Sequence, residues 1–187
     1  TSLLPEENCT PGENGVACRS APHGGRPEID DEDLAKVVLY VSSLAVPAMR
    51  DPGAFEVTRG SRLFREIGCA ACHTPTLQTG EHPTLPVLSN QTIHPYTDLL
   101  LHDMGEGLAD GLPDHGADGR EWRTPPLWGI GLIPVVSGHT LYLHDGRARN
   151  LEEAVLWHGG EAEGSRDRFR ALSPELRAAL IRFLESL

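Results

Sequence analysis

Five consecutive residues carry the clearest chemical signal in the sequence: Cys69-Ala70-Ala71-Cys72-His73. Two thiols that are separated by two residues can add to the two vinyl groups of one porphyrin, and the next residue is then placed beneath the iron. A neutral imidazole nitrogen is a suitable ligand there. The pattern therefore predicts one covalently bound c-type haem, with His73 as an axial ligand.

A thioredoxin-like redox pair or half of a zinc site could use the same two cysteines. A thioredoxin-like pair follows a strand and opens a helix, whereas here a helical pattern precedes the motif and Thr74-Pro75 follows it. A zinc site needs two more ligands at short spacing, and Cys9 and Cys18 are not spaced as a second Cys-x-x-Cys. Haem attachment is therefore the preferred interpretation.

The sequence has nine histidines, of which His73 is already assigned, and two methionines, and the second axial ligand has to come from this pool. His158 lies on the apolar face of a predicted helix, directly before the glycine that ends it. A core histidine satisfied by hydrogen bonds would fit the same position. Met104 is the alternative, because thioether ligation is common in cytochromes c, although a methionine also fills gaps in cores. Met49 is a weaker candidate.

Arginines and a tryptophan near these positions are candidates to hold the cofactor. Arg123, Arg147 and Arg149 could pair with the haem propionates, because a guanidinium matches a carboxylate bidentately; the alternative is ordinary surface charge. Trp157 adjoins His158 and could lie on an electron path, but packing against the porphyrin is the commoner role.

Helices have to position these residues. Apolar spacing predicts helices over 31–46, 54–67, 150–158 and 173–187, the second of which ends at Gly68 and leads into Cys69. We expect a short helix over 96–104 with Thr97 as its cap, and 127–143 could contain two short strands. The predicted fold class is mostly α: a class I c-type cytochrome-like helical domain with long loops and one short β-hairpin.

We expect the chain to consist of an irregular N-terminal segment and one folded domain. Residues 1–29 are rich in Pro, Gly and Asn and read as an irregular segment, stapled by a disulfide between Cys9 and Cys18. Residues 30–187 are expected to form the single cytochrome domain. Two cysteine pairs with different roles fit an oxidising compartment such as the periplasm.

Charge and hydropathy limit the partners. The formal net charge is −11 and no Lys/Arg cluster stands out, so we expect no nucleic acid partner. An acidic surface better suits a basic protein or a small substrate. No apolar run approaches the roughly 20 residues of a membrane span. The first residues lack a signal-peptide pattern and a starting Met, so we expect a mature form, a cleaved product or an excised piece.

Five strings follow one another along the sequence: GCAACHTPTL at 68–77, YTDLLLHDMG at 96–105, RTPPL at 123–127, YLHDG at 142–146 and LEEAVLWHGGEA at 151–162. In this order they resemble the di-haem oxidoreductase family, also labelled thiol oxidoreductases. This family is related to bacterial di-haem cytochrome c peroxidases and to the di-haem enzyme that forms tryptophylquinone. The resemblance runs from about Pro5 to the end of the chain.

The resemblance implies that this chain corresponds to the C-terminal haem domain of such a protein. His158 stands in the slot of the distal ligand, which favours it over Met104 and implies a low-spin bis-His haem. The relatives carry a second haem, and this chain has one attachment motif. Their calcium site includes Thr-x-Pro where this chain has His139, Thr140 and Leu141, so calcium is not carried over.

The function implied is electron transfer to or from a second haem that lies outside this chain, as part of an oxidoreductase rather than as a complete enzyme. Two alternatives stay open. One is an independent mono-haem electron carrier. The other is a mono-haem peroxidase or sensor whose sixth ligand can be displaced. The sequence does not determine the oligomeric state.

Overall fold

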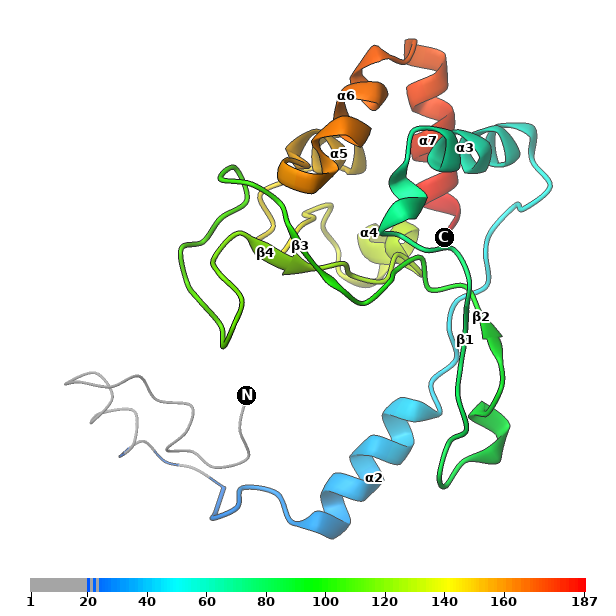
Figure 1. The fold of residues 1–187 in the computed structure, drawn as a ribbon. Helices are drawn as coiled ribbons and strands as arrows, with labels where there is room; N and C mark the ends of the chain where they lie inside the picture. The colour runs from blue at the N-terminus through cyan, green and yellow to red at the C-terminus, as the bar shows by residue number, and fades with distance from the viewer. Residues whose placement is uncertain (1–19, 21, 23) are drawn as a thin grey trace. The chain divides into compact units, whose positions relative to one another are not determined.

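The computed structural model describes Ser20, Pro22 and residues 24–187 (Figure 1). The expected disulfide between Cys9 and Cys18 lies outside the described residues. Contacts between residues divide the chain into two compact units, Thr1–Ala45 and Val46–Leu187. The expected division into 1–29 and 30–187 stays a prediction.

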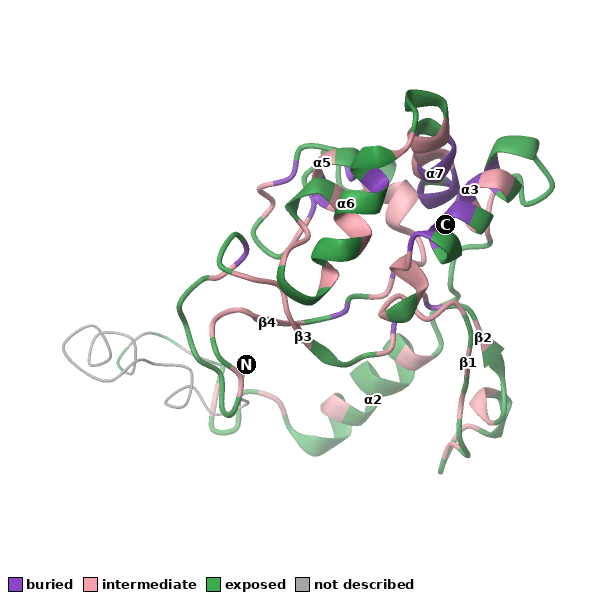
Figure 2. Ribbon diagram, turned by 45° about the horizontal axis from the view of Figure 1, so that its top comes forward, coloured by how far each residue is buried: buried purple, intermediate pink, exposed green. Residues whose placement is uncertain are grey.

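Helix α2 (Asp31–Ser42) is the helix found among the described residues of the first unit. The Asp30 carboxylate caps it by accepting a hydrogen bond from the Asp33 N–H at 2.8 Å. Three acidic residues in the first turn stabilise the helix, because their negative charge lies at the positive end of the helix dipole. No residue of α2 is buried, and the helix is mainly green, the colour of exposed residues, in Figure 2. The apolar face expected from the sequence is therefore present but uncovered.

The core of the second unit is built on α3 (Phe55–Glu66) and α7 (Pro174–Ser186), which pack against each other. They cross at Gly60, where an added Cβ would meet the carbonyl oxygen of Ala179 and lie 2.6 Å from the Cβ of Phe183. The apolar faces expected for both helices are confirmed. Their buried hydrophobic residues are Val57, Leu63, Phe64, Ala179, Leu180, Phe183 and Leu184.

Shorter helices complete this unit: α4 (Ile133–Val136), α5 (Leu151–Trp157) and α6 (Glu163–Ala171). Single 3₁₀ turns lie at Cys69–Ala71, Pro86–Leu88, Ile130–Leu132 and Gly160–Ala162. The Asn150 side chain caps α5, as its sequence position predicts, and α6 was not expected. Among the described helices, none is long and apolar enough to cross a membrane.

Two small antiparallel sheets connect the helices. Strand β1 (Leu77–Gln78) pairs with β2 (Thr92–Ile93), and β3 (Leu101–Asp103) pairs with β4 (Glu121–Arg123). The mostly α fold class with short hairpins is therefore confirmed.

Two local expectations were wrong. The segment 96–104 is extended rather than helical, because Tyr96 and Leu99 adopt left-handed backbone angles, with φ of 54° and 63°, that interrupt a right-handed helix. The segment 127–143 contains a 3₁₀ turn and α4 instead of strands. Its glycines and proline interrupt the regular pairing that strands need.

The tight crossing of α3 and α7 predicts a strong effect of one methyl group. Gly60→Ala should lower the free energy of unfolding by about 1–3 kcal/mol, because the new Cβ overlaps the main chain of α7. Without this overlap the substitution would stabilise the helix by about 0.5–1 kcal/mol. Urea unfolding followed by far-ultraviolet circular dichroism measures the difference. Gly53→Ala is the control, since nothing lies within 4 Å of its added Cβ.

Candidate functional site

The turn that carries the two cysteines begins at a glycine that no other residue can easily replace. Helix α3 is followed by Gly68, which has a φ of +94°, and Cys69 then opens the 3₁₀ turn. A Cβ on Gly68 would lie 2.8 Å from Nη2 of Arg168 and 2.9 Å from Oγ of Ser165. Arg168 Nε also donates a hydrogen bond to the carbonyl of Ile67 at 2.8 Å. Helix α6 thus closes over the start of the motif.

The two thiols are not set up for thiol–disulfide chemistry. Both cysteines are free in the structure. Burial raises the pKa of Cys69 to about 11, and burial, with the nearby carboxylates of Asp98 and Glu161, raises the pKa of Cys72. Reactive Cys-x-x-Cys pairs have lowered pKa values instead. The environment therefore argues against a thioredoxin-like role.

His73 is held in one tautomer by the main chain. Its Nδ1 lies 3.0 Å from the carbonyl oxygen of Tyr96, and because a carbonyl only accepts, Nδ1 carries the hydrogen. Burial lowers the pKa of His73 to about 4, so the ring is neutral at neutral pH. Nε2 therefore keeps a free lone pair. The ring packs beside Phe64, with 6.2 Å between the ring centroids.

His158 repeats this arrangement from another element. It follows the last turn of α5, where its own N–H bonds to the Val155 carbonyl at 3.2 Å, so the Ala154 carbonyl lacks its usual helical donor. The Nδ1–H of His158 supplies that bond at 2.8 Å. Burial lowers the pKa of His158 as well. This ring is also neutral, with Nε2 free.

The two imidazoles lie next to each other, with 6.4 Å between their centroids and 50° between their planes. Bonds from imidazole nitrogen to a metal are about 2.0 Å long, so two rings that bind one metal ion through Nε2 from opposite sides have centroids about 6 Å apart. The pair beside Cys69 and Cys72 thus fits the two axial ligands of a haem iron. Sequence reasoning proposed both residues, which come from separate elements.

The main chain of Met104 lies beside the turn that follows His158. Its N–H donates to the Arg120 carbonyl at 2.9 Å, and its carbonyl oxygen would lie 2.9 Å from a Cβ on Gly159. The choice between His158 and Met104 as the second axial ligand stays a prediction.

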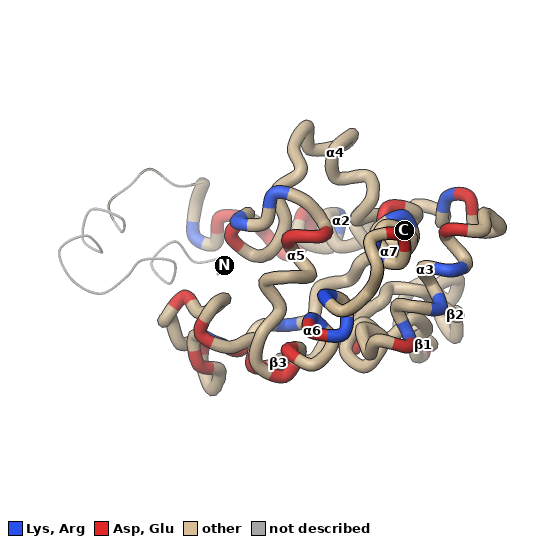
Figure 3. The backbone as a smooth tube through the Cα atoms, turned by 90° about the horizontal axis from the view of Figure 1, so that it is seen from above, with Lys and Arg blue, Asp and Glu red and all other residues tan. Residues whose placement is uncertain are grey.

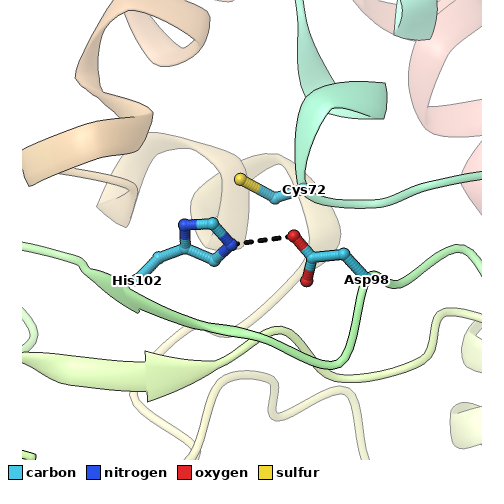
Figure 4. Close-up of side chains that lie close together, drawn as sticks. All are labelled: Cys72, Asp98 and His102. Atoms are coloured by element: carbon cyan, nitrogen blue, oxygen red, sulfur yellow. Dashed lines mark hydrogen bonds and ion pairs between the residues drawn. The ribbon is translucent and has the colours of Figure 1, made fainter.

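A third histidine, His102 on β3, lies between the carboxylates of Asp98 and Glu161; Figure 4 shows its contact with Asp98. Its Nε2 lies 2.9 Å from Oδ2 of Asp98, and its Nδ1 lies 2.8 Å from Oε2 of Glu161. Ionised carboxylates only accept hydrogen bonds, so both ring nitrogens donate and the ring is an imidazolium. Glu161 and Asp98 accordingly raise the pKa of His102.

Cys72, Asp98 and His102 form the group of potential metal ligands found in the described part of the chain, with ligand atoms within 4.8 Å of one another. Both nitrogens of His102 are already bonded, so it has no lone pair for a metal ion. His102 with its two carboxylates, Asp98 and Glu161, is better described as a clamp. It joins the segment that presents the Tyr96 carbonyl to the turn that follows His158.

Sequence reasoning missed this clamp. Asp98 and His102 are four residues apart, which suggests a helical neighbour pair, yet the segment between them is extended. Glu161 is 59 residues from His102 in sequence, so no local spacing connects them. The sequence signal that could have found the clamp is that Asp98 and His102 lie in one of the strings that resemble the family and Glu161 lies in another.

Thr97 was expected to cap a helix and instead fixes the loop beside His73. Its side chain is fully buried, and its hydroxyl donates to the Thr124 carbonyl at 2.7 Å and accepts from the Leu99 N–H at 2.9 Å. Its N–H also donates to the carbonyl of Thr74, the residue after His73. These bonds determine where the Tyr96 carbonyl lies.

A family model described as "Di-haem oxidoreductase, putative peroxidase" matches residues 12–187. The chain belongs to this family. Searches of curated proteins and of solved structures returned no match. Membership supports a redox role and haem binding, in agreement with the donor set described above.

The three arginines proposed to pair with the haem propionates differ in how many bonds they already make within this chain. Arg147 pairs with Asp145 at 2.7 Å, donates to the Gly107 carbonyl and lies over the Trp157 ring, 5.1 Å from its centroid. Arg149 pairs with Glu153. The Arg123 side chain is exposed and makes no hydrogen bond or ion pair with the described residues. Of the three arginines, Arg123 is therefore the most available to pair with a haem propionate. The roles of Arg123, Arg147 and Trp157 toward haem stay predictions.

The clamp predicts a pH-dependent contribution to stability. His102→Gln should lower the free energy of unfolding by about 1–3 kcal/mol, because two charge-assisted hydrogen bonds are weakened. His102 has a raised pKa in the folded state. Its contribution is therefore complete below its unfolded pKa of about 6.5 and is lost as pH rises through the folded value.

Chemical unfolding at several pH values measures this effect. The difference between the parent protein and His102→Gln should be larger at about pH 6 than at about pH 9. His115→Gln is the matched control, because the His115 side chain is 97% exposed. A difference that does not change with pH would show that His102 is not held as an imidazolium.

Proposed function

We propose that this chain holds one covalent haem c on Cys69 and Cys72, with His73 and His158 as axial ligands. In this proposal it acts in the periplasm as the electron-transfer domain of a di-haem oxidoreductase, relaying electrons to or from a second haem outside this chain. One observation carries the proposal. Two partly buried neutral imidazoles lie together beside the cysteine motif, each with Nδ1 bonded to a carbonyl and with no hydrogen bond to Nε2 from the described residues.

The residues of the chain would bind, orient and enclose the cofactor. Haem c supplies one-electron redox chemistry when it is bound. The hydrogen bonds from Nδ1 of His73 and His158 to main-chain carbonyls fix the ring orientations and make Nε2 a stronger donor. Two histidine ligands leave no coordination position for peroxide. This supports electron relay rather than peroxide chemistry for this domain.

The partner in this proposal is a second haem domain or a redox protein. The family is di-haem, whereas this sequence contains one Cys-x-x-Cys-His motif. Negative charge on the loop that follows β3, marked red in Figure 3, would favour a basic protein partner. The acidic residues of β3, this loop and β4 are Asp103, Glu106, Asp110, Asp114, Asp118 and Glu121.

The axial ligand assignment predicts opposite results for two substitutions. In the ferric protein, His158→Ala should remove the low-spin spectrum, because Nε2 of His158 no longer binds the iron. Met104→Ala should retain that spectrum. Absorption and electron paramagnetic resonance spectra measure the spin state, and the weak far-red band typical of methionine ligation should be absent. If Met104→Ala opens the iron instead, the ligand assignment is wrong.

The same spectra distinguish the proposed function from a peroxidase or sensor, and an electron-exchange assay distinguishes it from an independent carrier. A peroxidase or sensor with a displaceable sixth ligand would show high-spin ferric haem or would bind cyanide or carbon monoxide rapidly. An independent mono-haem carrier would be low-spin and would exchange electrons with a soluble partner in the absence of any second haem.

Covalent attachment is tested by removing the thiols. The double variant Cys69→Ser/Cys72→Ser should lose all haem that survives denaturing electrophoresis, because no thioether can form. Cys9→Ser/Cys18→Ser is the matched control and should retain it. Haem staining of the gel and the mass of the intact protein give the result. Retention of covalent haem in the first variant would contradict the attachment site.

A further inference from the structure

Helix α2 of the first unit has the same pattern as α7, the last helix of the second unit. Residues 30–44 align with residues 173–187 without a gap. Asp30 and Ser173 occupy the same position, and each caps its helix by accepting a hydrogen bond from the N–H three residues later. Both stretches end in Ser-Leu, at Ser43-Leu44 and Ser186-Leu187.

The apolar stripes of the two helices also coincide. Four positions at the spacing i, i+3, i+4 and i+7 are apolar in both, with an aromatic residue at the second. In α7 they are Leu180, Phe183, Leu184 and Leu187; in α2 they are Val37, Tyr40, Val41 and Leu44. We name the α2 set the α2 stripe.

The surroundings of the two stripes differ. The four residues of α7 are between 0% and 5% exposed. The packing partner of α7 is α3, the helix that directly precedes the cysteine motif, and Gly60 allows its close approach. The four residues of the α2 stripe are between 49% and 68% exposed. Figure 2 shows purple, the colour of buried residues, on α7 and α3, and mainly green on α2.

We propose that the α2 stripe is a docking surface for an amphipathic helix of the α3 type, which directly precedes the haem attachment motif of a second cytochrome domain. Helix α2 would then close that domain as α7 closes this one. The argument is the correspondence between α2 and α7, since the partner of α7 is visible in this chain. The proposal rests on the proposed function for the existence of a second haem domain.

One flanking position indicates what the docking helix has to accommodate. Lys36 stands where α7 has Ala179, which lies at the close crossing with Gly60. Lys36 is paired with Glu32 at 3.0 Å and Asp33 at 2.9 Å, so its ammonium group remains at the edge of the stripe. The partner helix therefore needs a small or an acidic residue opposite Lys36.

Photo-crosslinking in the product of the complete gene, matured with haem, tests this surface. Tyr40→benzoylphenylalanine places the reactive group on the α2 stripe in exchange for another aromatic residue. Leu44→benzoylphenylalanine provides a second stripe position. Ala35→benzoylphenylalanine is the control, because residue 35 lies on the opposite face of the helix. Mass spectrometry of the digested product identifies the attached peptide.

The expected result is that positions 40 and 44 crosslink to an amphipathic helix that directly precedes a second Cys-x-x-Cys-His motif, whereas position 35 does not. Crosslinks to residues 46–187, crosslinks to α2 of a second copy, or the absence of any crosslink would overturn the proposal. The ferric spectrum of the haem on Cys69 and Cys72, measured in the same sample, tests the proposed function separately. A low-spin spectrum without the expected crosslink would refute the docking surface alone.

Discussion

The site depends on the hydrogen bond that each of two partly buried imidazoles donates through Nδ1 to a main-chain carbonyl. One carbonyl is available because Tyr96 adopts a left-handed backbone angle. The other is available because α5 ends before the N–H of residue 158 can reach Ala154. If either carbonyl moved, the tautomer and direction of its ring would be lost. The surrounding loops hold the carbonyl oxygens of Tyr96 and Ala154 in position.

The core of the second unit and the site share the same side chains. Phe64 of α3 and Phe183 of α7 contact each other at the helix crossing, with 5.3 Å between their centroids, and both contact Tyr96. Phe64 also contacts the ring of His73. The packing that stabilises the helix pair therefore restricts the histidine that follows it. A substitution that loosens the crossing should disturb the site even from a distance.

The sequence was sufficient for the elements whose signals are local. The cysteine motif, the apolar faces of α3 and α7 and the cap of α5 are each determined within a few residues. The loops were harder, because a bond such as that between His102 and Glu161 joins residues 59 positions apart. Thr97 shows the same difficulty: its residue type suggested a helix cap, but its partners include Thr124, far along the chain. The sequence predicted an apolar stripe on both α2 and α7. It did not show that the stripe of α2 is exposed while that of α7 is buried, because periodicity alone does not show whether a stripe is covered.

The length of α2 has a consequence for the order of assembly. It has 12 residues, none of them buried, and isolated helices shorter than roughly 12–15 residues are only marginally stable in water. Its capping aspartate contributes about 1 kcal/mol, and the ion pairs of Lys36 lie on the exposed surface, where they add little stability. The helix therefore gains most of its order when an apolar surface covers it. If α2 docks as proposed, coil-to-helix conversion and docking would be one cooperative event, and the proposed second domain would reach its final structure together with α2.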